Sequence, residues 1–257
     1  MDMQLAGKKA LITGGSRGIG KAIARKLALE GVDCVICSRN ESSLREAARE
    51  LMAETGRNIH PIVADIGDPE SIQHLVERAA EAMGGIDILV NNGARVSGGD
   101  VPEDFHHIKE ELILKDFEEK FMGYFRCIRA VAPYMIKNNW GRIINVSGMA
   151  ARNAGSISAG ARNVSVVHLT KSSSVELGKH GITVNAVYPG ITETETTRER
   201  FPNEADLLEI TKMNSIGRLV KAEEIANVIT FLSSPLSVSI TGDVIDVAGG
   251  AGNAVHY

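Results

Sequence analysis

The stretch Lys9–Lys26 reads KALITGGSRGIGKAIARK and predicts how the chain folds. A short apolar run enters a glycine-rich turn at 13–20, and an amphipathic helix pattern follows, with Ile23 and Leu27 on one face. Strand, turn and helix in this order direct backbone N–H groups and the positive end of a helix dipole at one point, where a pyrophosphate binds. Glycine suits this turn because larger residues keep the backbone away from phosphates. The stretch therefore predicts nucleotide binding.

Outward from this turn, short apolar segments alternate with helical patterns along the whole chain. Such alternation predicts an α/β fold: a doubly wound parallel sheet of the Rossmann type with helices on both faces. No linker, repeat or low-complexity segment interrupts the pattern, so residues 1–257 are expected to form a single domain. Ligands of such a domain bind at the carboxyl ends of the strands.

The expected elements follow from the same pattern. Further strands are expected at 32–37, 59–64, 86–91, 142–147, 183–187 and 244–247, with helices at 41–55, 69–83, 105–138, 158–179 and 222–233. Asp68 is expected to cap the second of these helices, and the third is expected to be interrupted near Gly123 and Pro133. Residues 95–104 are predicted to form an irregular polar segment, and residues 192–206 form a polar stretch to which no element is assigned.

Composition and charge limit the possible partners. The net charge of −4 gives no reason to expect nucleic acid or an anionic membrane as a partner. No apolar run has transmembrane length, and the first residues lack the apolar core of a signal peptide. Cys34 and Cys37 form a CxxC inside an expected buried strand, where alternate residues point to opposite faces, so core packing is expected for both and for Cys127. A reducing, cytoplasmic location is expected.

Several motifs in order along the chain resemble those of the short-chain dehydrogenase/reductase family. The family's TGxxxGxG turn is matched by Thr13 and the three glycines that follow it at its spacing; its NNAG element is matched by residues 91–94, with the last two exchanged. Residues 141–147 resemble the strand that ends in the family's catalytic serine, 189–194 its PGxxxT element, and 217–218 with 240–250 its closing segment. The resemblance implies cofactor binding by Gly14, Ser16, Arg17, Gly18, Ile19, Gly20, Ser38, Arg39, Asp65, Ile66, Asn91, Gly93, Pro189, Gly190 and Thr194.

The end of the second strand indicates which dinucleotide binds. A fold that prefers NAD carries Asp or Glu there to bind the ribose 2′-OH, about twenty residues after the glycine turn. Here the chain reads Cys37-Ser38-Arg39-Asn40 instead. Arg39, together with Arg17 in the turn, is suited to clamp a 2′-phosphate by charge-assisted hydrogen bonds. We therefore expect NADP(H) to be preferred over NAD(H).

The resemblance fails at the family's catalytic Tyr-x-x-x-Lys pair. Counting back from the family-like Leu169-Thr170-Lys171 puts the tyrosine position at Ala159 and the lysine position at Asn163; counting forward from Ser147 can give the next residues, 160 and 164. Neither register supplies a tyrosine or a lysine. The family's helix asparagine is replaced by Lys120 when the chain is aligned on Gly123. Lysine and asparagine have exchanged places, and the phenol is missing.

Three hypotheses follow. In the first, the protein transfers hydride between NADP(H) and a carbonyl or secondary alcohol with another proton donor: Lys120, Ser147 or, more weakly, Tyr188, with Asn163 in the lysine position. A lysine desolvated in the crevice would have its pKa lowered toward neutrality, which suits acid catalysis. In the second, the fold binds NADP(H) without turnover, as a sensor or silent subunit. In the third, Ser147 and a cation form an oxyanion site for non-redox addition or elimination.

Other residues give weaker indications. Arg152 and Arg162 flank the altered site and are suited either to an anionic substrate or to the surface. Neighbouring residues on a helix point about 100° apart, so His106-His107 predicts no metal site. By resemblance, 192–206 would form a mobile substrate lid, and the helices at 105–138 and 158–179 would pack in a homodimer or homotetramer. A small-molecule carbonyl or alcohol is the expected partner.

Overall fold

A computed structural model describes residues 1–94 and 105–252 and shows one seven-stranded sheet in which every pairing is parallel. Its strands in spatial order are β3 (Ile59–Val63), β2 (Asp33–Ser38), β1 (Lys9–Thr13), β4 (Ile88–Asn91), β5 (Gly141–Val146), β6 (Ile182–Pro189) and β9 (Val244–Val247). The order reverses direction beside β1, between β1 and β4, which is where a doubly wound sheet opens a ligand crevice. The predicted fold class is confirmed.

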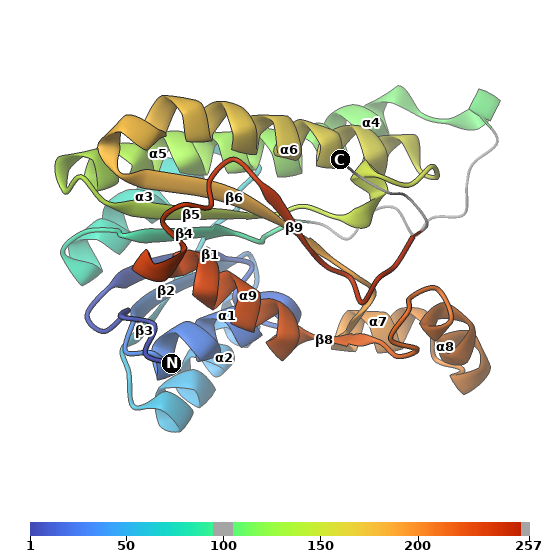
Figure 1. Cartoon of the computed structure of the whole chain (residues 1–257), viewed down its shortest axis with the longest axis horizontal. Helices are drawn as coiled ribbons and strands as arrows, with labels where there is room; N and C mark the ends of the chain where they lie inside the picture. The colour runs from blue at the N-terminus through green and yellow to red at the C-terminus, as the bar shows by residue number, and fades with distance from the viewer. Residues whose placement is uncertain (95–104, 253–257) are drawn as a thin grey trace.

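Helices cover both faces of this sheet (Figure 1). One layer contains α1 (Gly18–Leu29), α2 (Glu41–Thr55) and α9 (Ala222–Ser233). The other contains α3 (Pro69–Met83), α5 (Gly123–Lys137) and α6 (Ile157–Leu177). A two-stranded sheet, β7 (Thr192–Glu193) with β8 (Val220–Lys221), lies with α7 (Glu195–Arg200) and α8 (Glu204–Thr211) to one side of the main sheet (Figure 1).

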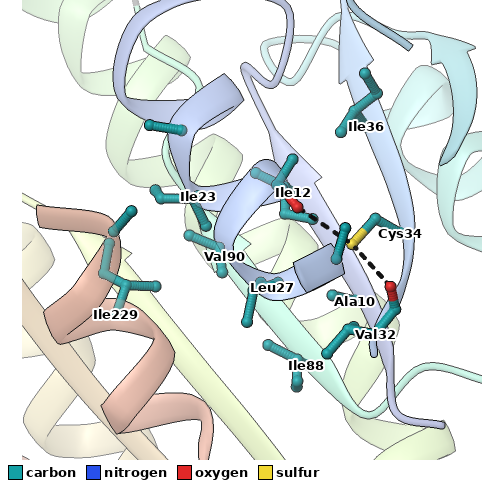
Figure 2. Packing of buried hydrophobic residues seen from close by; sticks show 14 of the residues in the cluster. Ala10, Ile12, Ile23, Leu27, Val32, Cys34, Ile36, Ile88, Val90 and Ile229 are labelled. Atoms are coloured by element: carbon teal, nitrogen blue, oxygen red, sulfur yellow. Dashed lines mark hydrogen bonds between the residues drawn. The ribbon is translucent and has the colours of Figure 1, made fainter. Parts of the chain in front are cut away.

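The sheet is buried on both faces, which explains its continuous apolar strands. On one face Ile12 of β1 packs with Ile23 of α1 and Ile229 of α9, all fully buried (Figure 2). On the other, residues such as Leu75 and Val131 form the second core cluster. Burial of this kind stabilises the fold by about 25 cal/mol per Å² of apolar surface removed from water.

The cysteines lie where the strand pattern predicts. Cys34 belongs to one core cluster and Cys37 to the other, so their side chains are on opposite faces of β2. Cys127 is buried as well, and all three are free thiols. Burial raises the pKa of the Cys37 thiol to about 12. These thiols are core residues rather than a redox pair.

Local capping sets several helix boundaries. The side chain of Asn40 accepts a hydrogen bond from the backbone N–H of Ser43 at the start of α2. Asp68 accepts from the N–H groups of Glu70 and Ser71 at the start of α3, with Pro69 in the first turn, as predicted.

The helical region 105–138 is divided near Gly123, as expected, but not near Pro133. Its first helix, α4 (Glu110–Phe117), leads into a π-helical segment, Glu118–Met122, before α5 begins at Gly123. Pro133 does not interrupt α5, because it lies on the exposed side, where water can satisfy the carbonyl that loses its partner.

The polar stretch 192–206 forms regular structure. It contains β7, α7 and the start of α8, and the Thr194 side chain caps α7 by accepting from the N–H of Thr197. The predicted irregular segment 95–104 lies outside the described residues. Within the described ranges, no helix is both long and apolar enough to cross a membrane.

Candidate active site and cofactor crevice

The turn between β1 and α1 is built for close backbone contact. Gly14 and Gly18 have positive φ angles of 67° and 52°. A Cβ at Gly20 would lie 2.1 Å from the Gly14 carbonyl oxygen, and one at Gly14 would lie 2.8 Å from Cα of Gly93. The extended residue Arg17 precedes α1 and makes no side-chain cap, so the first N–H groups of the helix remain for a ligand. This cradle fits the pyrophosphate of a dinucleotide.

Side chains from the end of β4 hold the turn in place. The Asn92 side chain donates to the carbonyl oxygens of Thr13 and Gly14, and the Thr13 hydroxyl accepts from the N–H groups of Asn92 and Gly93. Sequence reasoning did not single out Asn92 or Thr13 as supports of the turn. The NNAG-like sequence at 91–94 was the available signal for both residues, because it places the end of β4 beside the glycine turn after β1.

The predicted cofactor residues after β6 meet the glycine turn. A Cβ at Gly18 would lie 3.3 Å from the methyl group of Thr194. A cavity of about 290 Å³ lies between α1 and α7, and Gly18, Lys21, Thr194 and Arg198 are among the residues that line it. Gly190 donates its N–H to the Val247 carbonyl, which fixes the Pro189-Gly190 turn to the end of β9.

The residues expected at the adenosine end come together at the ends of β2 and β3. Nη1 of Arg39 lies 4.0 Å from Oδ2 of Asp65, and the Arg39 side chain is 55% exposed. Ser38 donates its hydroxyl to the Asn40 carbonyl, and Asp65 accepts from the N–H of Gly67. The guanidinium of Arg39 is therefore held beside the crevice and accessible to a phosphate.

Asn91, one of the predicted cofactor residues, lies at the end of β4 with its side chain in the core. Its side chain is fully buried within the sheet and donates to Oδ1 of Asn145 at 2.9 Å. Asn145 donates in turn to the hydroxyl of Thr170 on α6. The Asn91 side chain thus ties β4 to β5 and α6, because alternation along β4 turns it toward the helix layer of α5 and α6.

The two exchanged residues of the catalytic set are in direct contact. Nζ of Lys120 donates to Oδ1 of Asn163 at 2.8 Å and to the Ser147 carbonyl oxygen at 3.0 Å. The Ser147 hydroxyl donates to the Asn163 carbonyl oxygen at 3.1 Å. All three residues are at least 95% buried. Val164, which the alternative register puts in the lysine position, is 52% exposed, so the geometry favours the register of Ala159 and Asn163.

The π-helical segment presents Lys120 to this site. Wider helical turns of this kind occur mostly as single turns within α-helices and are frequent at functional sites. Tyr124, one turn later on α5, is fully buried and donates its hydroxyl to the Val146 carbonyl oxygen at 3.1 Å. The Lys120 ammonium lies 5.8 Å from the centre of the Tyr124 ring. Lys120 thereby reaches the end of β5 from the helix layer.

Burial changes the acidity of Lys120. Desolvation, and after it the positive charge of Arg162, lowers the pKa of Lys120 to about 7, while the Asp116 carboxylate acts in the opposite direction. Asp116 lies 3.6 Å from Nη1 of Arg162 and accepts a hydrogen bond from Ser158. Sequence reasoning missed Asp116 and Ser158; the four-residue spacing of Asp116 and Lys120 on one helical face was the available signal.

Tyr188, the weakest of the predicted proton donors, is poorly suited to that role. It is 3% exposed, and the Arg152 guanidinium lies over its ring at 4.7 Å from the centre. Burial is the largest influence on its phenol and raises its pKa. A phenol that donates protons near neutrality needs a lowered pKa instead.

Within residues 1–94 and 105–252, no group of three or more His, Cys, Asp or Glu side chains is arranged to hold an ion.

Comparisons with known proteins identify relatives of the whole fold. A family model described as Enoyl-(Acyl carrier protein) reductase matches residues 14–252. The chain is 36% identical over 250 residues to 3-oxoacyl-acyl-carrier-protein reductase FabG of Vibrio cholerae, covering 96% of this chain and 98% of that one. It is 35% identical over 257 residues to a ketoacyl reductase of the granaticin polyketide synthase of Streptomyces violaceoruber, covering 95% and 93%.

Two solved structures are also similar. L-Sorbose reductase from Gluconobacter frateurii, complexed with NADPH and L-sorbose, superposes with a TM-score of 0.92 at 30% identity, covering 99% of this chain and 100% of that one. Actinorhodin polyketide ketoreductase with NADPH has a TM-score of 0.89 at 33% identity, covering 96% and 98%.

Proposed function

The chain belongs to the short-chain dehydrogenase/reductase family, and from this premise we propose that it is an NADP(H)-dependent oxidoreductase that acts on a carbonyl or secondary alcohol with Lys120 as its proton donor. The observation that carries the proposal is the buried contact of the Lys120 ammonium with Ser147 and Asn163 at the end of β5.

The glycine cradle supports the cofactor half of the proposal. Its backbone N–H groups would hold the pyrophosphate, and Arg39 with Arg17 would hold the 2′-phosphate. Two of the similar structures are complexes with NADPH. A bound reduced nicotinamide supplies the hydride, so the protein must supply the proton and hold the substrate oxygen.

Lys120 is suited to supply that proton. An ammonium group has three N–H donors, and the Ser147 carbonyl and the Asn163 side chain accept two of them. The third can donate to a carbonyl oxygen held beside the Ser147 hydroxyl. A pKa of about 7 keeps a substantial fraction of Lys120 protonated at neutral pH and makes the proton easy to transfer. Asn163 acts as a positioning residue for the ammonium.

A turnover experiment with NADPH and a panel of ketones and aldehydes tests the proposal. Removal of an acid–base group lowers the rate about 10²–10⁴-fold, so Lys120→Met and Ser147→Ala should show losses of this order while NADPH binding is kept. Lys115→Met, at an exposed lysine of α4, is the matched control and should behave like the wild type.

Two results would contradict the proposal. If Lys120→Met turns over at the wild-type rate, the proton comes from another group. If the wild type binds NADPH but no carbonyl substrate oxidises it, the alternative hypotheses gain: a silent NADP(H)-binding subunit or a non-redox enzyme on the same fold.

Assembly and location stay predictions. A homodimer or homotetramer is expected with α5 and α6 at its interface. A reducing cytoplasmic location is compatible with the three buried free cysteines.

A further inference from the structure

We propose that Arg152 is the substrate-recognition residue of this site and that the carbonyl substrate carries an anionic group, a carboxylate or a phosphate, which replaces Asp246 on the Arg152 guanidinium. The proposal rests on the proposed oxidoreductase function and names the substrate class for it.

The position of Arg152 is the first argument. It ends the short helical turn Met149–Ala151, which follows Ser147 almost directly in the chain. Its guanidinium lies on the ring of Tyr188. The N–H of Ser147 donates to the carbonyl of Val187 at 2.9 Å, so Tyr188 follows on the strand beside Ser147. Val146 and Val187 both belong to the core cluster beneath α1 and α9. Because side chains alternate between the two faces of a sheet, the next residues, Ser147 and Tyr188, both face the other side. Arg152 therefore stands beside the proposed reaction centre.

The bonding of Arg152 is the second argument. Its Nη1 donates to Oδ2 of Asp246 on β9. An arginine has five N–H donors in a planar fork, and the Asp246 carboxylate together with a hydrogen bond to Tyr188 uses only some of them. The ring of Tyr188 holds the plane of that fork, so a second acceptor would meet a pre-organised donor set at low entropic cost.

The charges near the site are the third argument. The cations Lys120, Arg152 and Arg162 lie around the end of β5 and the start of α6, with Asp116 and Asp246 as their carboxylate partners. Arg162 and Asp116 are both buried, with side chains 8% and 10% exposed. Asp246 is 45% exposed and Arg152 20%. The Arg152–Asp246 pair is thus the more exposed of the two.

A simple structural ion pair makes a different prediction from an anion site. If Arg152 and Asp246 only fasten the loop after β5 to β9, loss of either partner has the same effect. If Asp246 occupies the place of a substrate anion, removing the Asp246 charge strengthens substrate binding, whereas removing the Arg152 charge weakens it. The two variants then shift affinity in opposite directions.

The experiment compares matched ketones in the complete chain. The carboxylate arm uses 4-oxopentanoate and its amide; the phosphate arm uses dihydroxyacetone phosphate and dihydroxyacetone. Binding to the chain–NADP⁺ complex is measured by calorimetry, which needs no turnover, and kcat/KM is measured with NADPH. Arg129→Gln is the control, because Arg129 also stacks on an aromatic ring, at 5.4 Å from Phe125, away from this site.

The wild type should bind the anionic member of at least one pair more tightly than the neutral one. A hydrogen-bonded charge pair is worth about 10- to 100-fold in affinity, so Arg152→Gln should abolish a preference of that size, Arg152→Lys should keep part of it, and Asp246→Asn should increase it. The neutral ketones should respond little to any of these changes.

Three outcomes overturn the inference. They are equal binding of anionic and neutral partners, equal weakening by Arg152→Gln and Asp246→Asn, and an effect of Arg129→Gln as large as that of Arg152→Gln. Turnover of neutral ketones alone would sink the inference and leave the proposed function standing. Anion binding at Arg152 without turnover of any ketone would contradict the proposed function, and with it the statement that the bound anion is part of the substrate.

Discussion

Nζ of Lys120 lies 2.8 Å from Oδ1 of Asn163, so the two residues that have exchanged places in the catalytic set join the π-helical segment before α5 to α6. The cation enters from the helix before β5, and the amide from the helix after it. The exchange therefore keeps a cation beside Ser147 although the phenol is lost, and it keeps that cation away from water.

The pH dependence of the rate should follow the protonation of Lys120. Carbonyl reduction needs the ammonium form, and burial lowers the pKa of Lys120 to about 7. We expect kcat/KM for reduction to be constant in mild acid and to fall above about pH 7, up to tenfold per pH unit, whereas alcohol oxidation changes in the opposite sense. Lys120→Arg stays protonated, so its kcat/KM for reduction should not fall above about pH 7. If the fall is unchanged in this variant, the titrating group is another residue.

Stability should depend on pH through the same side chain. A lysine in an unfolded chain titrates near 10.4, whereas Lys120 in the folded chain titrates at about 7, so between these values the unfolded state binds the additional proton. The free energy of unfolding should therefore rise with pH across this window, by roughly 1 kcal/mol per pH unit. Urea denaturation of the wild type and Lys120→Met at several pH values isolates the effect. If the free energies of unfolding of the two proteins change with pH in parallel, Lys120 is not desolvated in the folded chain.

Arg39 should set the preference between the two dinucleotides. Arg39 follows β2, and its exposed guanidinium lies beside Asp65, which follows β3. A charge-assisted pair of an arginine with the 2′-phosphate is worth about 10- to 100-fold in affinity. Arg39→Ala should weaken NADPH binding by this factor and leave NADH binding nearly unchanged, as measured by nicotinamide fluorescence. Arg45→Ala, at an exposed arginine paired with Glu41, is the control. Equal loss of both cofactors would contradict the assignment.

Gly20 should tolerate no side chain. A Cβ there would lie 2.1 Å from the Gly14 carbonyl oxygen, so Gly20→Ala must displace the turn that would hold the pyrophosphate. We expect loss of NADPH binding together with a lower melting temperature. Gly178 has helical φ, and a Cβ there would meet no atom within 4 Å, so Gly178→Ala should be neutral or slightly stabilising. Wild-type NADPH affinity in Gly20→Ala would refute the cradle.

Much of the fold could be predicted because its signals are local. The helices at 41–55, 69–83 and 222–233 begin and end where capping residues and apolar periodicity indicate. The π-helical segment at 118–122 gave no such signal, since a helix of either kind satisfies the same apolar spacing. Thr194 was matched to the family's element, but its capping of α7 was overlooked.

The sequence by itself determined the nucleotide-binding turn, the parallel sheet and the lack of any tyrosine or lysine between Gly148 and Leu169. Only the tertiary structure decided that Lys120 and Asn163 meet, that Asn91 is turned into the core, and that Asp116 pairs with Arg162. The physical reason is that a turn or a strand pattern depends on neighbours in the chain. The contacts of a buried polar group, and its pKa, depend on residues brought together from distant segments and on the water excluded between them.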